Sequence, residues 1–203
     1  MSRRSRERAK KGEKTKQILM SVFLAVVMIF SVFGILIGTQ SDKLSFGGHD
    51  FKVDQNRYTT KIDGKELYFY TLPYEVQYIN VSDSAMSKIK NSVYMLAVFN
   101  PAAAGESLPA IEIVRFDFVT LLTDKFFYSG VEEPSPLYTT LPTLSCANAS
   151  AQAPAIIFNV SESSSIVEDG NCIYLNGQGV DFLRFRDRIL YDYYGVYEDA
   201  EGQ

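Results

Sequence analysis

The sequence contains no tryptophan, one histidine and two cysteines among its 203 residues. Three Cys and His residues cannot supply the four ligands of a structural zinc site, and two cysteines exclude a cysteine-rich secreted scaffold. Apolar residues make up 46% and charged residues 22%. This composition excludes collagen-like and fully disordered chains and multi-span membrane proteins. Walker, G-x-G-x-x-G and C-x-x-C motifs are also absent.

Charge is divided unevenly along the chain. Residues 1–17 have net charge +6, residues 18–38 have no charged side chain, and residues 39–203 have net charge −10. The basic residues that set the charge of the first segment are Arg3, Arg4, Arg6, Arg8, Lys10, Lys11, Lys14 and Lys16. The chain therefore has a basic tail, an uncharged run and an acidic main part.

The uncharged run, residues 18–38, predicts a transmembrane helix. Its 21 residues span about 30 Å as a helix, which matches the hydrocarbon core of a bilayer. The alternatives are a cleaved signal peptide and a buried core helix. We favour an uncleaved anchor because the run is longer than a signal-peptide core and no small-residue cleavage site follows it.

The basic tail sets the expected orientation. By the positive-inside rule, residues 1–17 stay in the cytoplasm and the rest of the chain lies outside the cell membrane. We expect a linker over residues 39–48, a globular domain over residues 49–197 and a loose acidic tail over residues 198–203. The basic tail, residues 1–17, then contacts the lipid bilayer. Nucleic acid is not an expected partner, since the basic residues are not interleaved with aromatic ones.

The first part of the outer region has strand signals. The Asp-Gly pair at residues 63–64 is a strong hairpin turn because both residues tolerate positive φ. We expect a three-stranded meander over residues 46–71. A short helix, Asp83–Lys90, capped by its first residue, follows. Residues 93–99 form an unbroken apolar run that is typical of a strand buried on both faces.

The second part mixes helices and strands. Apolar residues at spacings of three and four predict a helix over residues 109–124, and three prolines within residues 131–144 indicate a loop. A strand over residues 155–158, a hairpin over residues 165–175 and an amphipathic helix over residues 180–194 follow. The polar residues that we expect on the solvent side of the last helix are Arg184, Asp187, Arg188 and Asp192.

The expected order, β-β-β-α-β-α-loop-β-β-β-α, predicts one α+β or α/β domain with a mixed sheet. Its second half resembles a thioredoxin-type domain, in which a proline precedes the third strand and a hairpin and a helix follow. The missing C-x-x-C motif means that the resemblance implies no dithiol activity. The last 60 residues also resemble uncharacterised archaeal single-pass membrane proteins, through Cys146, Pro154–Ile157, Asn171–Ile173, Asp187–Tyr191 and Gly195. That resemblance implies no activity.

Cys146 and Cys172 both lie in the outer region, where an oxidising environment allows a disulfide. We expect them to be bonded, with two free buried thiols as the alternative. A catalytic thiol is not expected, because the single histidine, His49, is distant in sequence and falls in a predicted loop. No metal site or cofactor is expected either.

Three N-x-S sequons, at Asn80, Asn148 and Asn159, are glycosylation acceptors if the host modifies exported chains. The sequence shows no catalytic constellation. We expect a membrane-anchored outer domain for binding or assembly, with a protein partner. The alternatives are an envelope enzyme with a site built from scattered residues, and a basic tail that recruits a cytoplasmic partner or RNA.

Overall fold

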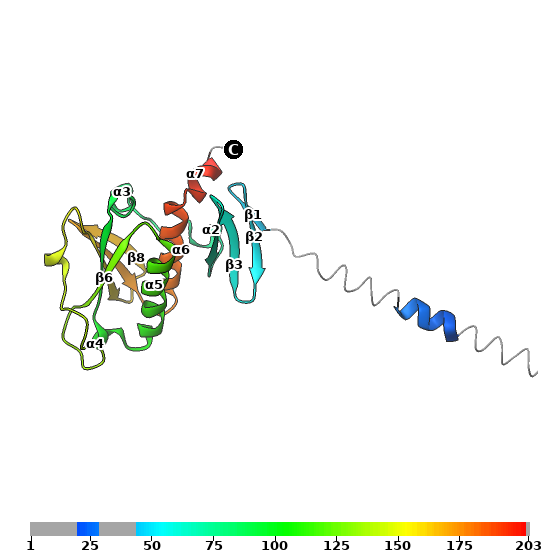
Figure 1. The fold of residues 1–203 in the computed structure, drawn as a ribbon, viewed down its shortest axis with the longest axis horizontal. Coiled ribbons are helices and arrows are strands. Elements are labelled where there is room, and N and C mark those ends of the chain that lie inside the picture. Colours follow the sequence, from blue (N-terminus) through cyan, green and yellow to red (C-terminus); the bar gives the residue numbers. More distant parts are fainter. Residues whose placement is uncertain (1–19, 29–43, 202–203) are drawn as a thin grey trace, which may run out of the picture. The chain divides into compact units, whose positions relative to one another are not determined.

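The structure is a computed structural model that describes residues 20–28 and 44–201. It divides into two compact units, Met1–Asp42 and Lys43–Gln203. In the first unit, residues 20–28 are helical (Figure 1). Their side chains are exposed. Among the described residues, no helix has both the length and the apolar character needed to cross a membrane. The basic tail and the rest of the predicted span lie outside the described residues, so the anchor stays a prediction.

The second unit begins with a four-stranded antiparallel sheet in chain order, formed by β1 (Leu44–Phe46), β2 (His49–Asp54), β3 (Arg57–Ile62) and β4 (Lys65–Phe69). The predicted meander is confirmed over β2, β3 and β4, and its turn has positive φ at Asp63 (50°) and Gly64 (77°). Strand β1 lies within the segment predicted as a linker. It pairs with β2 because Gly47 and Gly48 adopt positive φ, which permits a tight turn.

A second sheet has five strands in the order β6-β5-β7-β9-β8. Its strands are β5 (Tyr94–Phe99), β6 (Phe126–Val131), β7 (Ala155–Val160), β8 (Ser165–Asp169) and β9 (Cys172–Gly177). All pairs are parallel except β8 with β9. The predicted strands at β5 and β7 and the predicted hairpin are confirmed, and they lie in a mixed sheet. The expectation of one sheet is wrong, because the meander forms a separate sheet.

Two features of this sheet differ from the expectation. Strand β6 was not predicted, because its sequence, FFYSGV, has no alternation of apolar and polar residues. In the hairpin, the second strand, β9, pairs with β7, while β8 lies at the edge. After β7 the chain therefore forms β8 at the edge of the sheet, and then returns to form β9 between β7 and β8.

The helices are α2 (Pro73–Val76), α3 (Asp83–Asn91), α4 (Pro101–Ala104), α5 (Leu108–Leu121), α6 (Asp181–Tyr193) and α7 (Val196–Glu201), with 3₁₀ turns η1 (Gly105–Ser107) and η2 (Cys146–Asn148). The three predicted helices correspond to α3, α5 and α6. The cap of α3 is Ser82, whose Oγ accepts the N–H of Ala85 at 3.1 Å, and not Asp83. The acidic C-terminal segment expected to be loose is helical as far as Glu201.

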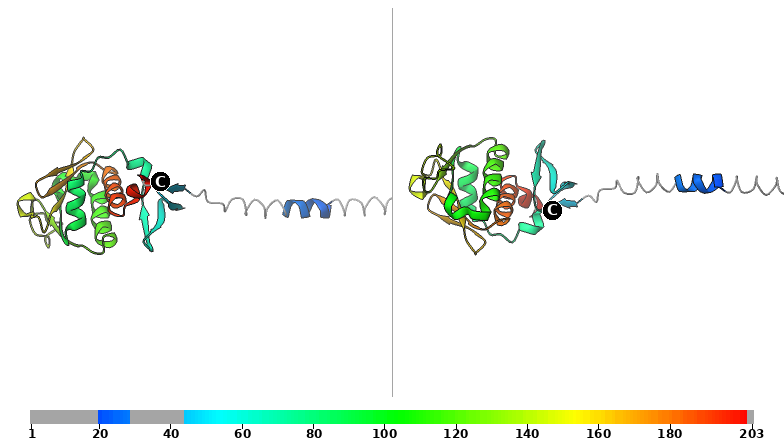
Figure 2. Two further views of the ribbon diagram at one scale, coloured as in Figure 1. Left: turned by 90° about the horizontal axis from the view of Figure 1, so that it is seen from above. Right: turned by 90° about the horizontal axis from the view of Figure 1, so that it is seen from below.

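The unit has three layers, which Figures 1 and 2 show from different sides. Helices α5 and α6 cover one face of the five-stranded sheet. The four-stranded sheet packs on the other side of α6, where the Tyr191 ring stacks on Phe69 with centroids 4.1 Å apart. Strand β1, where the chain enters this unit, therefore lies across the helices from the five-stranded sheet.

The opposite face of the five-stranded sheet is covered by an irregular segment, residues 132–153. Leu144, Cys146 and Ala149 pack there on a small cluster of buried residues: Leu96, Val98, Ala155, Ile157 and Cys172. The segment also pairs with the edge of β6 through a parallel bridge between Val131 and Thr143.

Candidate interaction surface

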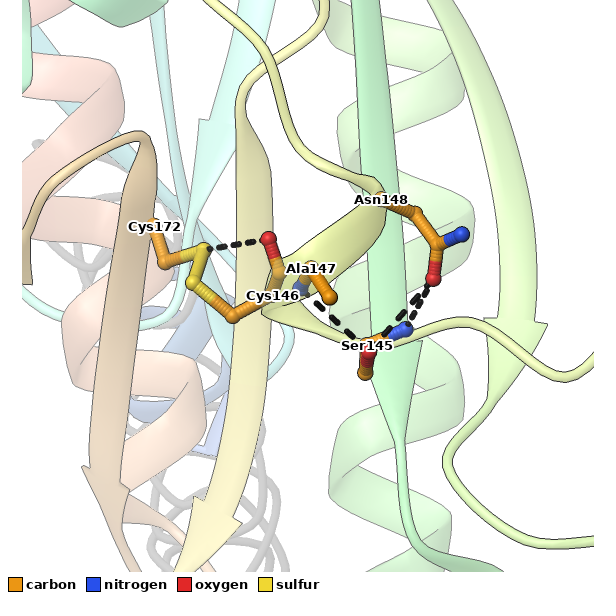
Figure 3. The surroundings of a disulfide bond; sticks show 5 residues. All are labelled: Ser145, Cys146, Ala147, Asn148 and Cys172. Carbon is orange, nitrogen blue, oxygen red and sulfur yellow. Dashed lines mark hydrogen bonds between the residues drawn. A yellow bond between two sulfur atoms is a disulfide. The ribbon is translucent and has the colours of Figure 1, made fainter.

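The predicted disulfide between Cys146 and Cys172 is confirmed, with Cα atoms 5.8 Å apart. Cys172 begins β9 and is fully buried. Cys146 begins η2, where the Ser145 side chain accepts the N–H of Ala147 and Asn148 Oδ1 accepts the N–H of Ser145 (Figure 3). The bond therefore fastens the irregular segment to the sheet.

The three sequon asparagines are exposed. Asn148 lies in η2, and Asn159, in β7, donates from Nδ2 to Asn176 Oδ1 at 2.7 Å. Asn80 lies between α2 and α3. Their exposure permits glycosylation, which stays a prediction. His49 begins strand β2 rather than lying in a loop.

Charged residues in the hollow between α3 and α6 are paired with each other. A hollow of about 330 Å³ between α3 and α6 is lined by Lys90, Arg188, Asp192 and Glu198. In it, Lys90 pairs with Glu198 at 3.1 Å and Arg188 with Asp192 at 2.9 Å. Over residues 20–28 and 44–201 no group of His, Cys, Asp and Glu is arranged to hold a metal ion. The charged residues of these two ion pairs therefore bind each other and do not indicate a ligand.

A charged cluster is buried between the helices and the four-stranded sheet. Arg186, Asp187 and Asp117 are each at most 2% exposed. Arg186 Nη1 donates to Asp187 Oδ1 and, at 2.9 Å, to the Tyr68 carbonyl, while Nε forms an ion pair with Asp117 Oδ2 at 3.2 Å. The expectation that Asp187 faces solvent is wrong. The four-stranded sheet covers that side of α6, and no feature of the α6 sequence alone reveals this cover.

Two tyrosines, Tyr68 in β4 and Tyr70 just after it, complete this cluster. The hydroxyl of Tyr68 donates to Asp117 Oδ1, and that of Tyr70 donates to Asp117 Oδ2 at 3.2 Å. Burial, and then the charge of Asp117, raises the pKa of Tyr70 to about 12, so its hydroxyl stays protonated and donates. The cluster joins β4 to α5 and α6, and we interpret it as structural.

Helix α5 buries two of its three charged residues and exposes several large apolar side chains. Arg115 and Asp117 are buried, and Glu112 is bound by Arg115 Nη1 at 2.7 Å and by the Tyr138 hydroxyl at 2.9 Å. The exposed positions include Ile113, Phe116 and Val119, and Phe116 is 66% exposed. A helix that is apolar on every side is normally covered on every side.

Strand β6, at one edge of the five-stranded sheet, is also apolar and exposed. Phe126 is 63% exposed and Tyr128 57%, and both pack loosely with Tyr94 of β5. The strand has no charged residue and no proline, the devices that usually protect an edge from pairing. The other edge, β8, has charged residues, and its Glu168 is bound by Lys88 of α3.

These two features adjoin. Helix α5 packs on β6 through Phe118 and Phe127, whose rings are stacked with centroids 6.0 Å apart. The exposed side chains therefore lie on two sides of this edge of the sheet: those of α5 on the helix side, and those of Phe126 and Tyr128 on the opposite face, because alternate side chains of a strand point to opposite faces. We call this the α5–β6 surface, and its residues are Tyr94, Ile113, Phe116, Val119, Phe126 and Tyr128.

Sequence reasoning identified only the buried side of α5, through Ile111, Val114, Phe118 and Leu121, all of which are buried. The missed signal is the second apolar stripe at Ile113, Phe116 and Val119, which is exposed. Charge positions also carried information, because Arg115 and Asp117 fall on the inner side of the helix.

Comparison of the chain with protein-family models, curated proteins and solved structures finds no match. The resemblances to thioredoxin-type domains and to archaeal single-pass membrane proteins stay predictions.

Proposed function

We propose that this chain is a single-pass membrane protein whose outer domain is an assembly module that docks a protein partner through the α5–β6 surface. The observation that carries the proposal is the reversed polarity of α5. Arg115 and Asp117 are buried, Glu112 is paired with Arg115, and the large exposed side chains are apolar.

Anchoring in the cell membrane rests on the sequence. The uncharged run at residues 18–38 is long enough to cross a bilayer, and the basic tail favours a cytoplasmic N-terminus. The disulfide supports an outer location, because such bonds persist in oxidising compartments and are rare in the cytosol.

A protein partner fits the α5–β6 surface better than a lipid surface does. Residues 39–203 have net charge −10, so an anionic leaflet repels the domain. Aromatic side chains such as Phe116, Phe126 and Tyr128 are enriched at protein interfaces, where they bury a large area at low entropic cost.

The test is the native mass of the full chain, extracted from membranes in a mild detergent and measured by light scattering. We expect the wild type to run as an assembly larger than one chain, and Phe116→Glu to lose it. Val53→Glu is the matched control, because Val53 is 58% exposed in β2, away from the α5–β6 surface. An unchanged assembly mass for Phe116→Glu would overturn the proposal.

A further inference from the structure

Strand β6 offers backbone groups for pairing at the edge of the sheet. The N–H of Phe126 donates to the Val93 carbonyl on the β5 side, whereas Val131 exchanges bonds with Pro142 and Leu144 on the outer side. Because alternate residues of a strand point to opposite sides, the backbone groups of Phe127 and Ser129 also point outward. The outer edge of β6 can therefore accept another strand.

Building on the proposed function, we infer that the partner is a second copy of this chain, bound by antiparallel pairing of β6 with β6 and by packing of α5 against α5. Two copies then form one continuous ten-stranded sheet around a two-fold axis.

Charge favours a like partner. The α5–β6 surface has no charged side chain of its own, and the adjacent Glu112 is already bound by Arg115 and Tyr138. Two acidic domains can therefore meet there without placing like charges opposite each other. A strongly charged partner finds no opposite charge on this surface.

Symmetry also fits two chains anchored in one membrane. A two-fold axis between antiparallel strands runs perpendicular to the sheet. In this fold the perpendicular direction leads from the five-stranded sheet through the helices to the four-stranded sheet (Figures 1 and 2). The axis therefore brings both copies of Leu44, where the chain enters the domain, to the same side, as anchoring in one membrane requires.

The pairing register follows from the available groups. Pairing that is centred on Tyr128 places Phe127 opposite Ser129 of the other copy and uses the outward-pointing backbone groups of these two residues. It places the two Tyr128 residues in a non-hydrogen-bonded pair, with Cα atoms about 4.5 Å apart. It also places Phe126 over Gly130, beside the Leu144 side chain.

Membrane anchoring compensates for the modest area of this contact. Stable complexes in solution bury roughly 800 Å² per partner. Helix α5 has 14 residues, so it is about 21 Å long and about 10 Å wide, and its outer side alone is smaller than that. The edge of β6 adds to the contact, and confinement of both copies in one bilayer raises their effective concentration.

The test is oxidative crosslinking of the full chain in native membranes. Two cysteines whose Cα atoms are about 4.5 Å apart can form a disulfide, and Cys146 and Cys172 are already bonded to each other. We expect Tyr128→Cys to give a reducible product with twice the mass of the 22.8 kDa chain. Val167→Cys, which is 47% exposed on the opposite edge strand β8, is the control and should give none. Adding Phe116→Glu to Tyr128→Cys should abolish the product.

Absence of the product for Tyr128→Cys, or a product with a different protein, would overturn the second-copy inference. Either result is separable from failure of the proposed function, since Phe116→Glu tests the assembly itself by its native mass. An assembly that is sensitive to Phe116→Glu without this crosslink means that the surface docks another protein.

Discussion

Asp187 Oδ2 accepts three hydrogen bonds from Tyr70 and Thr71: the N–H of each residue at 2.7 Å and the Thr71 hydroxyl at 2.8 Å. The other oxygen of this carboxylate binds Arg186. The fully buried side chain of Asp187 in α6 thus accepts the backbone N–H groups of the two residues that follow β4. This contact holds the four-stranded sheet on the helices, so its loss should lower the stability of the whole domain.

We expect Asp187→Asn to lower the free energy of unfolding by about 3–5 kcal/mol, because it leaves the Arg186 charge buried with one fewer anion. Urea unfolding, followed by circular dichroism, measures this change. Arg184→Gln is the control on the same helix, since the Arg184 side chain is 45% exposed and its loss should cost less than about 1 kcal/mol. Equal effects for the two variants would contradict the structural role of the cluster.

Glu168 should make stability sensitive to acid. Its hydrogen bonds with Lys88 and Ser82 lower its pKa from 4.5 to about 2. A lowered folded-state pKa gives a contribution that is complete above about pH 4.5 and is lost as the pH falls toward 2. We expect about 1 kcal/mol for this surface group. Unfolding midpoints measured between pH 5 and pH 2 should fall less steeply for Glu168→Gln than for the wild type.

Removal of the disulfide should destabilise the domain without unfolding it. The bond joins residues separated by 26 positions, which corresponds to about 3–4 kcal/mol in the chain-entropy view. For a domain of this size we expect the melting temperature of the Cys146→Ala, Cys172→Ala double variant to fall by about 10 °C. A melting temperature equal to that of the wild type would mean that the segment over residues 132–153 is held by its packing alone.

Gly130 is needed because Leu144 packs directly on the strand there. A Cβ atom on Gly130 would lie 2.5–2.9 Å from side-chain atoms of Leu144, so one of the two must move. We expect Gly130→Ala to cost about 1–3 kcal/mol. Adding Leu144→Ala should recover part of that loss, and a thermal-denaturation double-mutant cycle measures the coupling. Strictly additive effects would contradict the close approach.

The parts of the fold that local patterns specify were predictable from the sequence. The turn at Asp63-Gly64, the buried strands β5 and β7, and the apolar side of α6 each have their signal within a few neighbouring residues. The cysteine pair was predictable because only two cysteines exist.

Features that depend on distant packing were not predictable. Asp187 is polar and lies on a helix, which predicts an outside position, yet the segment that binds it, just after β4, lies 116 residues earlier. Strand β6 has an aromatic outer side instead of a polar one. Reasoning that assumes a polar exterior does not find exposed apolar residues such as those of the α5–β6 surface.

The most direct measurement is the rate at which a membrane-impermeant maleimide labels single cysteines on intact cells. The variants are Phe116→Cys on α5 and Val53→Cys on β2, at side chains that are 66% and 58% exposed in the single chain. If the domain lies outside and docks through the α5–β6 surface, Val53→Cys is labelled rapidly and Phe116→Cys is protected until the assembly is dissociated. Equal rapid labelling of both would contradict docking, and labelling of neither before lysis would contradict the outer location.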